Sequence, residues 1–149
     1  TSYSLYLNTL EPWYAKHIAS DWHSLVGEMM SVLQEEDKLL EIVQLVGSDA
    51  LPERQQLVLA VSRLIREVLL QQNAFHEIDT FCELKKTYSI MKTISSFSKL
   101  ANSALDNGAR VQQILSTKAK DRLSEVKFVR DYEKLLDELT RQMEKELKV

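Results

Sequence analysis

The chain has 149 residues, of which 44% are hydrophobic and 28% are charged, so it can bury the core of one domain and is not a disordered chain. Its net charge of −3 argues against nucleic acid as a partner, and no apolar run approaches the roughly 20 residues of a membrane-spanning helix. A lone cysteine, Cys82, allows no internal disulfide, which fits a reducing compartment. With only three glycines and two prolines, the chain is expected to be all-α.

The first 20 residues show no strong helical period apart from one short helix, expected from about Glu11 to Ile18. The sequence begins with TSYSLY and not with methionine, so we expect it to continue a longer protein. Residues 1–20 are then a connector from an upstream domain, and residues 21–149 are a helical domain.

Two helices are predicted next, joined by a short loop. The first is expected from about Asp21, a favoured N-cap residue, to Gly47, a favoured helix stop. The second is expected from Pro52 to about Gln71, and the short connection makes the pair an antiparallel αα-hairpin. The charged run Glu35–Lys38 is expected to be mainly solvated. The inward-facing positions are Trp22, Leu25, Val26, Met29, Leu33, Leu40 and Val43 in the first helix, and Leu57, Val61, Leu64, Ile65, Val68 and Leu69 in the second.

A third long helix is predicted to begin with a capping box at Thr80–Glu83 and to end at Asn107-Gly108. Shorter helices are expected near Arg110–Leu115 and Lys118–Val126, followed by an amphipathic helix from about Asp131 to Leu147. The expected fold is therefore a helical bundle built on the αα-hairpin, with further short helices and a C-terminal amphipathic helix.

The sequence contains no constellation that predicts an active site or a metal site. It has neither the phosphate-binding pattern G-x-x-x-x-G-K-[ST] nor G-x-G-x-x-G. His17 and His23 are too far out of phase to share a helix face, and Cys82 is more often simply buried than a nucleophile. Composition alone favours a stand-alone helical interaction module without an enzymatic role.

The helical pattern breaks within Leu69–Cys82, LLQQNAFHEIDTFC, although that stretch contains no glycine or proline. Polar amides precede Phe75, which looks exposed. Two interpretations are open from the residues alone: Phe75 belongs to the core and the amides cap a helix end, or these side chains contact a ligand.

Three stretches, Ser2–Tyr6, Leu33–Gln55 and Leu69–Cys82, together resemble the catalytic A subunit of V/A-type rotary ATPases. The resemblance covers about the first two-thirds of the chain; from about Ser95 only the helical character matches. It implies that this is the C-terminal helical domain of that subunit, with the nucleotide-binding domain and its P-loop upstream. The implied activity is ATP hydrolysis or synthesis coupled to proton or sodium transport, in the peripheral sector of a membrane-bound complex on the cytoplasmic side.

The resemblance also implies cofactors and partners. ATP or ADP with Mg²⁺ would bind the full subunit, whereas this chain alone should bind none and be inactive. The expected partners are the B subunits of the same hexameric ring and the central rotor stalk, with no nucleic acid and no direct insertion into the membrane. In the family the hairpin loop pushes on the rotor, which assigns contact to Gly47, Ser48, Asp49, Ala50, Leu51, Pro52 and Glu53.

A second set of roles falls on the break in the helical pattern. In the family this turn lines the adenine side of the nucleotide pocket, which assigns that contact to Gln72, Asn73, Ala74 and Phe75. An aromatic face stacks on a base without needing a specific donor, so Phe75 suits the role. Phe81 stands where the family usually has tyrosine.

At the rotor-contact loop, only Asp49 and Glu53 are acidic, so a steric push on the rotor is expected rather than a purely electrostatic one.

Overall fold

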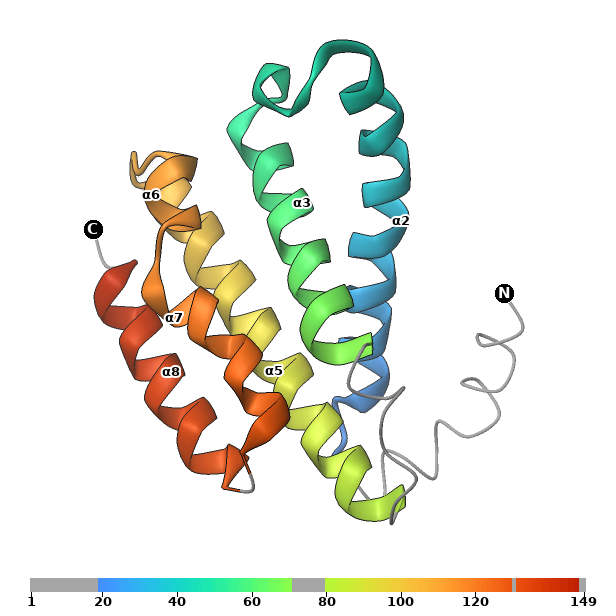
Figure 1. The fold of residues 1–149 in the computed structure, drawn as a ribbon, viewed down its shortest axis with the longest axis vertical. Helices are drawn as coiled ribbons and strands as arrows, with labels where there is room; N and C mark the ends of the chain where they lie inside the picture. Colours follow the sequence, from blue (N-terminus) through green and yellow to red (C-terminus); the bar gives the residue numbers. More distant parts are fainter. Residues whose placement is uncertain (1–18, 71–79, 130, 148–149) are drawn as a thin grey trace.

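A computed structural model describes residues 19–70, 80–129 and 131–147, and these described residues form helices, turns and connections without a strand. The all-α prediction is therefore confirmed. A helical hairpin, formed by α2 (Trp22–Val46) and α3 (Glu53–Leu64), packs against one long helix, α5 (Thr80–Asp106), and the C-terminal helix α8 (Tyr132–Glu146) packs against α5 as well, while shorter elements between α5 and α8 also contact the second limb of the hairpin (Figure 1). The long helix is thus the layer on which both halves of the domain rest.

The hairpin is built as predicted, with one departure at its second limb. Its elements are α2 (Trp22–Val46), a 3-10 turn η1 (Ser48–Ala50), α3 (Glu53–Leu64) and a π-helical continuation η2 (Ile65–Leu70). The prediction of one α-helix from Pro52 is wrong at both ends: Pro52 has extended ψ of 150° and precedes the helix, and the last turns widen to π. The hydrogen-bond register of a helix end depends on what packs against it, which the sequence pattern does not contain.

The remaining helices also match their predicted positions. The side chains of the Thr80–Glu83 capping box lie outside the described residues, as do the expected helix near Glu11–Ile18 and the stretch 71–79. The elements are α5 (Thr80–Asp106), α6 (Val111–Leu115), α7 (Lys118–Arg122), the 3-10 helix η3 (Leu123–Phe128) and α8 (Tyr132–Glu146).

One contiguous hydrophobic cluster joins the α-helices of the described residues, and its centre is on α5 at Ile90, Ile94 and Phe97, each 0% exposed. All six predicted inward positions of the second helix are buried, which confirms that stripe. The stripe of the first helix is partly wrong, because Leu39 is 3% exposed and Leu40 is 42% exposed. Beyond Met29 the inward face of α2 runs through Glu36 and Leu39, because Glu36 has a partner on the other limb.

Candidate functional site

The end of the hairpin begins at Gly47, whose φ of +84° and ψ of 158° are essentially restricted to glycine. Its N–H donates to the Val43 carbonyl oxygen at 2.8 Å, which ends α2. After the η1 turn the chain is pinned again at Leu51, which is 5% exposed and whose carbonyl accepts from Gln56 Nε2 at 2.8 Å. The connection is therefore a turn whose backbone is fixed at both ends, and only some of its residues are exposed to solvent.

The loop residues that the sequence assigned to contact divide into two groups. Gly47, Ser48, Asp49, Ala50 and Pro52 are exposed, as expected of a contact surface. Leu51 points inward, and Glu53 is half-buried and already paired, its Oε1 lying 2.9 Å from Arg110 Nε. Leu51 and Glu53 are thus occupied within the domain.

The first turn of α3 is tied to the other half of the domain by a second set of polar contacts. Arg54 Nη1 donates to Asn102 Oδ1 at 2.7 Å, and Arg54 Nη2 donates to Asp106 Oδ1 at 2.5 Å. Together with the Glu53–Arg110 pair, these contacts attach the start of α3 to the end of α5 and the start of α6. We call these three contacts the α3 brace.

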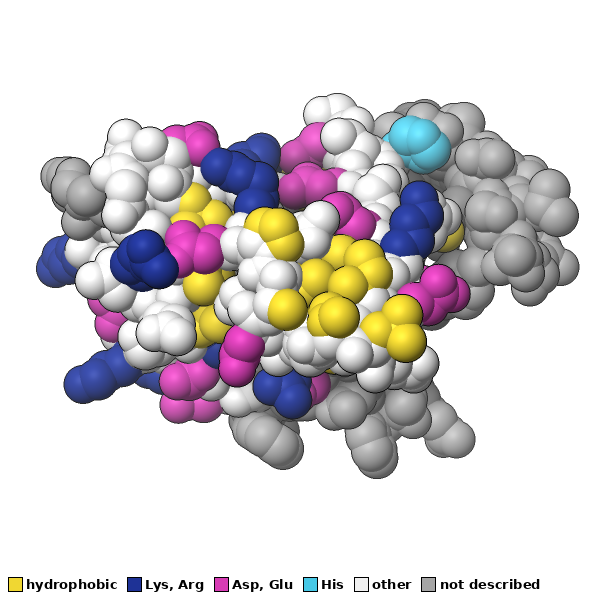
Figure 2. Space-filling model, turned by 90° about the horizontal axis from the view of Figure 1, so that it is seen from above, with side chains coloured by type: hydrophobic (Ala, Val, Ile, Leu, Met, Phe, Trp, Pro, Cys, Tyr) yellow, Lys and Arg dark blue, Asp and Glu magenta, His cyan; other side chains and the backbone are white. Residues whose placement is uncertain are grey.

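The last turns of α2 have no such attachment among the described residues, and they expose apolar side chains. Leu45 is 86% exposed, Val46 is 60% exposed and Ile42 is 43% exposed. Figure 2 looks onto this end of the molecule and shows hydrophobic side chains gathered there among charged ones. We call Ile42, Leu45 and Val46 the α2 end face. This face was not predicted from the sequence, although its signal was present: apolar residues that continue off the inward stripe.

A buried polar contact holds the two limbs of the hairpin together below this end. Glu36 on α2 is 7% exposed. Its Oε1 accepts from Arg66 Nε at 2.7 Å and also from Arg66 Nη2, and its Oε2 accepts from Ser62 Oγ at 2.7 Å. The hydrogen bonds from Arg66, aided by Ser62, hold the pKa of Glu36 below its usual range against the opposing effect of burial. The expectation that this charged run is solvated is wrong for Glu36.

The base of α2 is fixed to α5 by a further polar group. Tyr88 Oη donates to Asp21 Oδ1 at 2.7 Å, and Lys92 Nζ donates to Asp21 Oδ2 at 3.3 Å. The hydrogen bond from Tyr88, and then that from Lys92, lower the pKa of the Asp21 carboxyl. Asp21 therefore joins two helices and does not cap α2 with its side chain, as its type had suggested.

The residues assigned to the adenine wall, Gln72, Asn73, Ala74 and Phe75, lie outside the described part of the chain. The structure does describe what leads into them. The π-helical η2 ends at Leu70, directly before this stretch.

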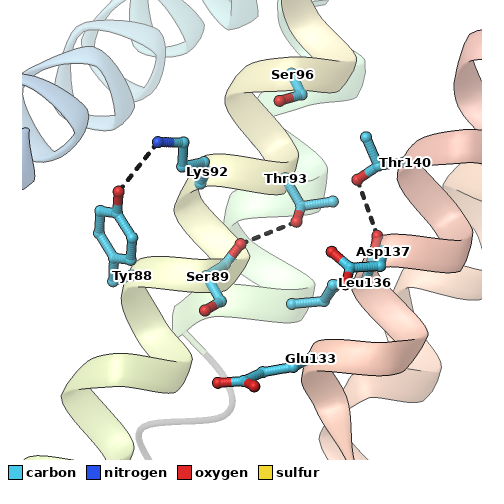
Figure 3. A pocket seen from close by; sticks show the side chains of 9 residues that line it. All are labelled: Tyr88, Ser89, Lys92, Thr93, Ser96, Glu133, Leu136, Asp137 and Thr140. Atoms are coloured by element: carbon cyan, nitrogen blue, oxygen red, sulfur yellow. Dashed lines mark hydrogen bonds between the residues drawn. The ribbon is translucent and has the colours of Figure 1, made fainter.

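A hollow of about 420 Å³ lies between α5 and α8, and Figure 3 shows its lining. Its polar groups are largely spent on neighbours: Thr93 Oγ1 donates to the Ser89 carbonyl at 2.9 Å, Thr140 Oγ1 to the Leu136 carbonyl at 2.8 Å, and Lys92 Nζ to Tyr88 Oη at 3.1 Å. These groups do not converge on one point as a catalytic or anion-binding site requires.

Neither a metal site nor a membrane span is found in the part of the chain that the structure describes. Within it, no three His, Cys, Asp or Glu side chains come together in a way that would hold a metal ion. None of the described helices is both long enough and apolar enough to cross a membrane.

Comparison with known proteins places this architecture in a family. Residues 11–115 match the family described as the C-terminal domain of V and A type ATP synthase. The A subunit of the A-type ATP synthase of Methanoregula boonei is 50% identical over 145 residues, which is 97% of this chain and 25% of that protein. The corresponding A subunits of Methanoculleus marisnigri and Methanocorpusculum labreanum are 48% and 46% identical over 97% and 99% of this chain, again 25% of each relative.

The similarity thus extends into the last third of the chain, where only helical character was expected to match. The chain spans a quarter of the length of these curated relatives. From the match over residues 11–115 and the identity to its relatives, the chain belongs to the family of C-terminal domains of V- and A-type ATP synthases.

Proposed function

We propose that this chain is part of the catalytic subunit of a V/A-type rotary ATPase, which couples ATP hydrolysis or synthesis to proton or sodium transport with ATP or ADP and Mg²⁺. The observation that carries the proposal is the 50% identity to the A subunit of an A-type ATP synthase over 97% of the chain. In the assembled protein, residues 1–20 would connect this domain to an upstream nucleotide-binding domain. The partners would be the B subunits of the same ring and the central rotor, at the cytoplasmic side of the membrane.

The hairpin end is proposed to contact the rotor. Two features support this contact: the exposure of Ser48, Asp49 and Ala50, and the stiffness of the two helical limbs behind them. That stiffness has two sources, the buried apolar stripe of α3 and the Glu36–Arg66 contact across the hairpin.

Deletion of Ser48–Ala50 in the full subunit tests this contact. The deletion should weaken rotation of the assembled complex while nucleotide affinity stays nearly unchanged, because the residues proposed for the adenine wall follow η2 in the sequence, whereas the deletion precedes α3. A large loss of nucleotide affinity would contradict the separation of the two roles.

The stretch Gln72–Phe75 is proposed to form one wall of the adenine pocket, with Phe75 against the base. The π-helical η2 that leads into it supports this role, because π-helical turns are rare and occur frequently at functional sites. Replacement of Phe75 by Ala in the full subunit should lower nucleotide affinity, since stacking on a base is worth about 1–3 kcal/mol. Phe75→Trp is the matched control, because it retains an aromatic face. Unchanged affinity and hydrolysis in Phe75→Ala would remove the adenine role.

The two proposed sites are joined by α3 and η2, which run from Glu53 to Leu70. At about 1.5 Å per residue this path is about 27 Å long. If nucleotide binds two orientations of the domain with different affinities, its binding shifts the population toward the orientation that it binds more tightly. The end of the hairpin would then change position with nucleotide occupancy. This chain by itself, without a P-loop in its sequence, should bind ATP negligibly; calorimetry that detected micromolar affinity would contradict the division of the pocket between domains.

A further inference from the structure

We infer that Arg66 is a positioning residue for nucleotide recognition: through its contact with Glu36 on α2 it holds the π-helical η2 in one rotation, and with it the start of the stretch proposed to line the adenine pocket. The inference rests on the proposed function, because it names what holds the adenine wall in place. It makes recognition of the base depend on α2, a helix that supplies none of the residues proposed to touch the base.

The cluster that carries the inference joins two limbs at one buried carboxylate. Glu36 is 7% exposed, and both of its oxygens are engaged: Oε1 accepts from Arg66 Nε at 2.7 Å and from Arg66 Nη2, and Oε2 accepts from Ser62 Oγ at 2.7 Å. Two donors from one planar guanidinium restrict its orientation more than a single donor would. Since Ser62 lies on α3 and Arg66 on η2, the carboxylate holds the second limb on both sides of its α-to-π junction.

That junction is where the second limb changes its hydrogen-bond register. The α-helix α3 ends at Leu64, and the next six residues, Ile65–Leu70, are π-helical. A π-helical turn is closed by i→i+5 hydrogen bonds and is wider than an α-helical one. The register at the junction therefore sets the direction in which the chain leaves the end of η2, and contacts on both sides of the junction favour this register over a continuous α-helix.

The opposite side of η2 is held by the core. Ile65, Val68 and Leu69 are at most 6% exposed, and η2 packs on α5 and η3. Apolar burial is non-directional, so it tolerates small rotations of a helix that a directed hydrogen-bond pair resists. The exposed Glu67 of η2 pairs with Arg63 of the same limb at 3.5 Å, so that pair adds no link to α2.

The rotation of η2 bears on the adenine wall because little chain separates the two. Arg66 precedes Gln72 by six residues and Phe75 by nine. A group that contacts a ligand is effective only when it is held within about 0.5 Å of its place. Loss of the Glu36–Arg66 contact therefore weakens recognition of the base, and it leaves unchanged the phosphate contacts that the upstream domain is proposed to make.

The test compares ATP with inorganic tripolyphosphate, which has the phosphates but no base, each with Mg²⁺ and the full subunit assembled in its ring. Arg66→Met should lower the affinity for ATP by about fivefold or more, as partial loss of a base stack would, and change that for tripolyphosphate by less than about twofold. General damage to the domain would lower both affinities together. Arg63→Met is the matched control, because Arg63 pairs within its own limb, and it should change neither affinity by more than about twofold.

The double variant Glu36→Leu/Arg66→Met separates positioning from stability. It should be more stable than Arg66→Met, because no buried carboxylate is left without its counter-ion. It still lacks the directed contact, so its affinity for ATP should stay as low as that of Arg66→Met while its affinity for tripolyphosphate matches the wild type. A double variant that binds ATP as tightly as the wild type would overturn the inference. The same comparison decides the matter if the Arg66→Met subunit does not assemble.

Failure of this inference is distinguishable from failure of the proposed adenine wall, through Phe75→Ala measured with the same two ligands. If Phe75→Ala lowers the affinity for ATP alone and Arg66→Met changes neither affinity, the adenine wall stands and the positioning role of Arg66 is wrong. Equal losses for both ligands in Arg66→Met also overturn that role. If Phe75→Ala leaves the affinity for ATP unchanged, the adenine wall itself is wrong, and the inference with it.

Discussion

The Glu36 carboxylate on α2 accepts a 2.7 Å hydrogen bond from Arg66 Nε on η2, which makes it a polar link between the two limbs of the hairpin. Glu36 is nearly inaccessible, whereas the Arg66 side chain is 51% exposed. A buried carboxylate is costly without a counter-ion. Removal of Arg66 alone should therefore destabilise the domain more than replacement of both residues by apolar ones.

Replacement of Arg66 by Met should therefore lower the free energy of unfolding by about 1–3 kcal/mol, because the buried Glu36 loses its cationic donor and keeps only the hydrogen bond from Ser62. The double variant Glu36→Leu/Arg66→Met should recover part of that loss, since apolar replacements of a buried pair are often neutral or stabilising. Urea denaturation of the 149-residue chain measures both values. A double variant less stable than Arg66→Met would show that the carboxylate contributes stability even without its partner.

Acid should destabilise the domain through the same group. The pKa of Glu36 is lowered in the folded state from its ordinary value of 4.5, so its contribution is complete above that pH and is lost as the pH falls through the lower folded value. Asp21 acts in the same direction below its ordinary pKa of 3.8. Unfolding free energies measured from neutral pH downward should fall less steeply in Glu36→Gln than in the wild type. Equal slopes would show that Glu36 has the same pKa folded and unfolded.

The Asp21 junction predicts an order of effects. Tyr88→Phe removes the 2.7 Å donor to a carboxylate and should cost about 0.5–1.5 kcal/mol of unfolding free energy. Lys92→Met removes a longer contact from a side chain that is 58% exposed, and should cost about 0–1 kcal/mol. Thermal unfolding of the two variants compares them, and a larger loss in Lys92→Met would contradict this ranking.

Two glycines should respond in opposite directions to alanine. Gly27 lies inside α2, and a Cβ there would meet no atom within 4 Å, so Gly27→Ala should stabilise the chain by about 0.5–1 kcal/mol. Gly47 also has open space, but its φ is +84°, so Gly47→Ala should cost about 1–3 kcal/mol. Denaturation midpoints of the two variants provide the test, and a stabilised Gly47→Ala would indicate that the turn relaxes to another conformation.

The hairpin was predictable because its local signals agree. Gly47 stops one helix, and the six apolar positions of the second helix fall on one stripe that is buried throughout. Glu36 was not predictable in the same way. It sits among other charged residues, and its partner Arg66 is 30 positions away, so only the folded chain brings the two together.

The candidate site shows the same limit. The exposure of Ser48–Ala50 could be predicted from the sequence, because turn-forming residues mark this loop and short loops lie on the surface. The engagement of Glu53 depends on Arg110, which the fold brings from the start of α6. The exposure of Leu45 depends on which side of α2 faces the rest of the domain, and an apolar residue by itself does not reveal that.

The α3 brace makes the two limbs of the hairpin mechanically unequal. A force on the start of α3 passes directly into α5 and α6 through Glu53 and Arg54. A force on Leu45 instead acts about 9 Å beyond Leu39, the last buried side chain of α2, at 1.5 Å per residue. The end of α2 should therefore bend under a smaller force than the start of α3, which the α3 brace ties to α5 and α6.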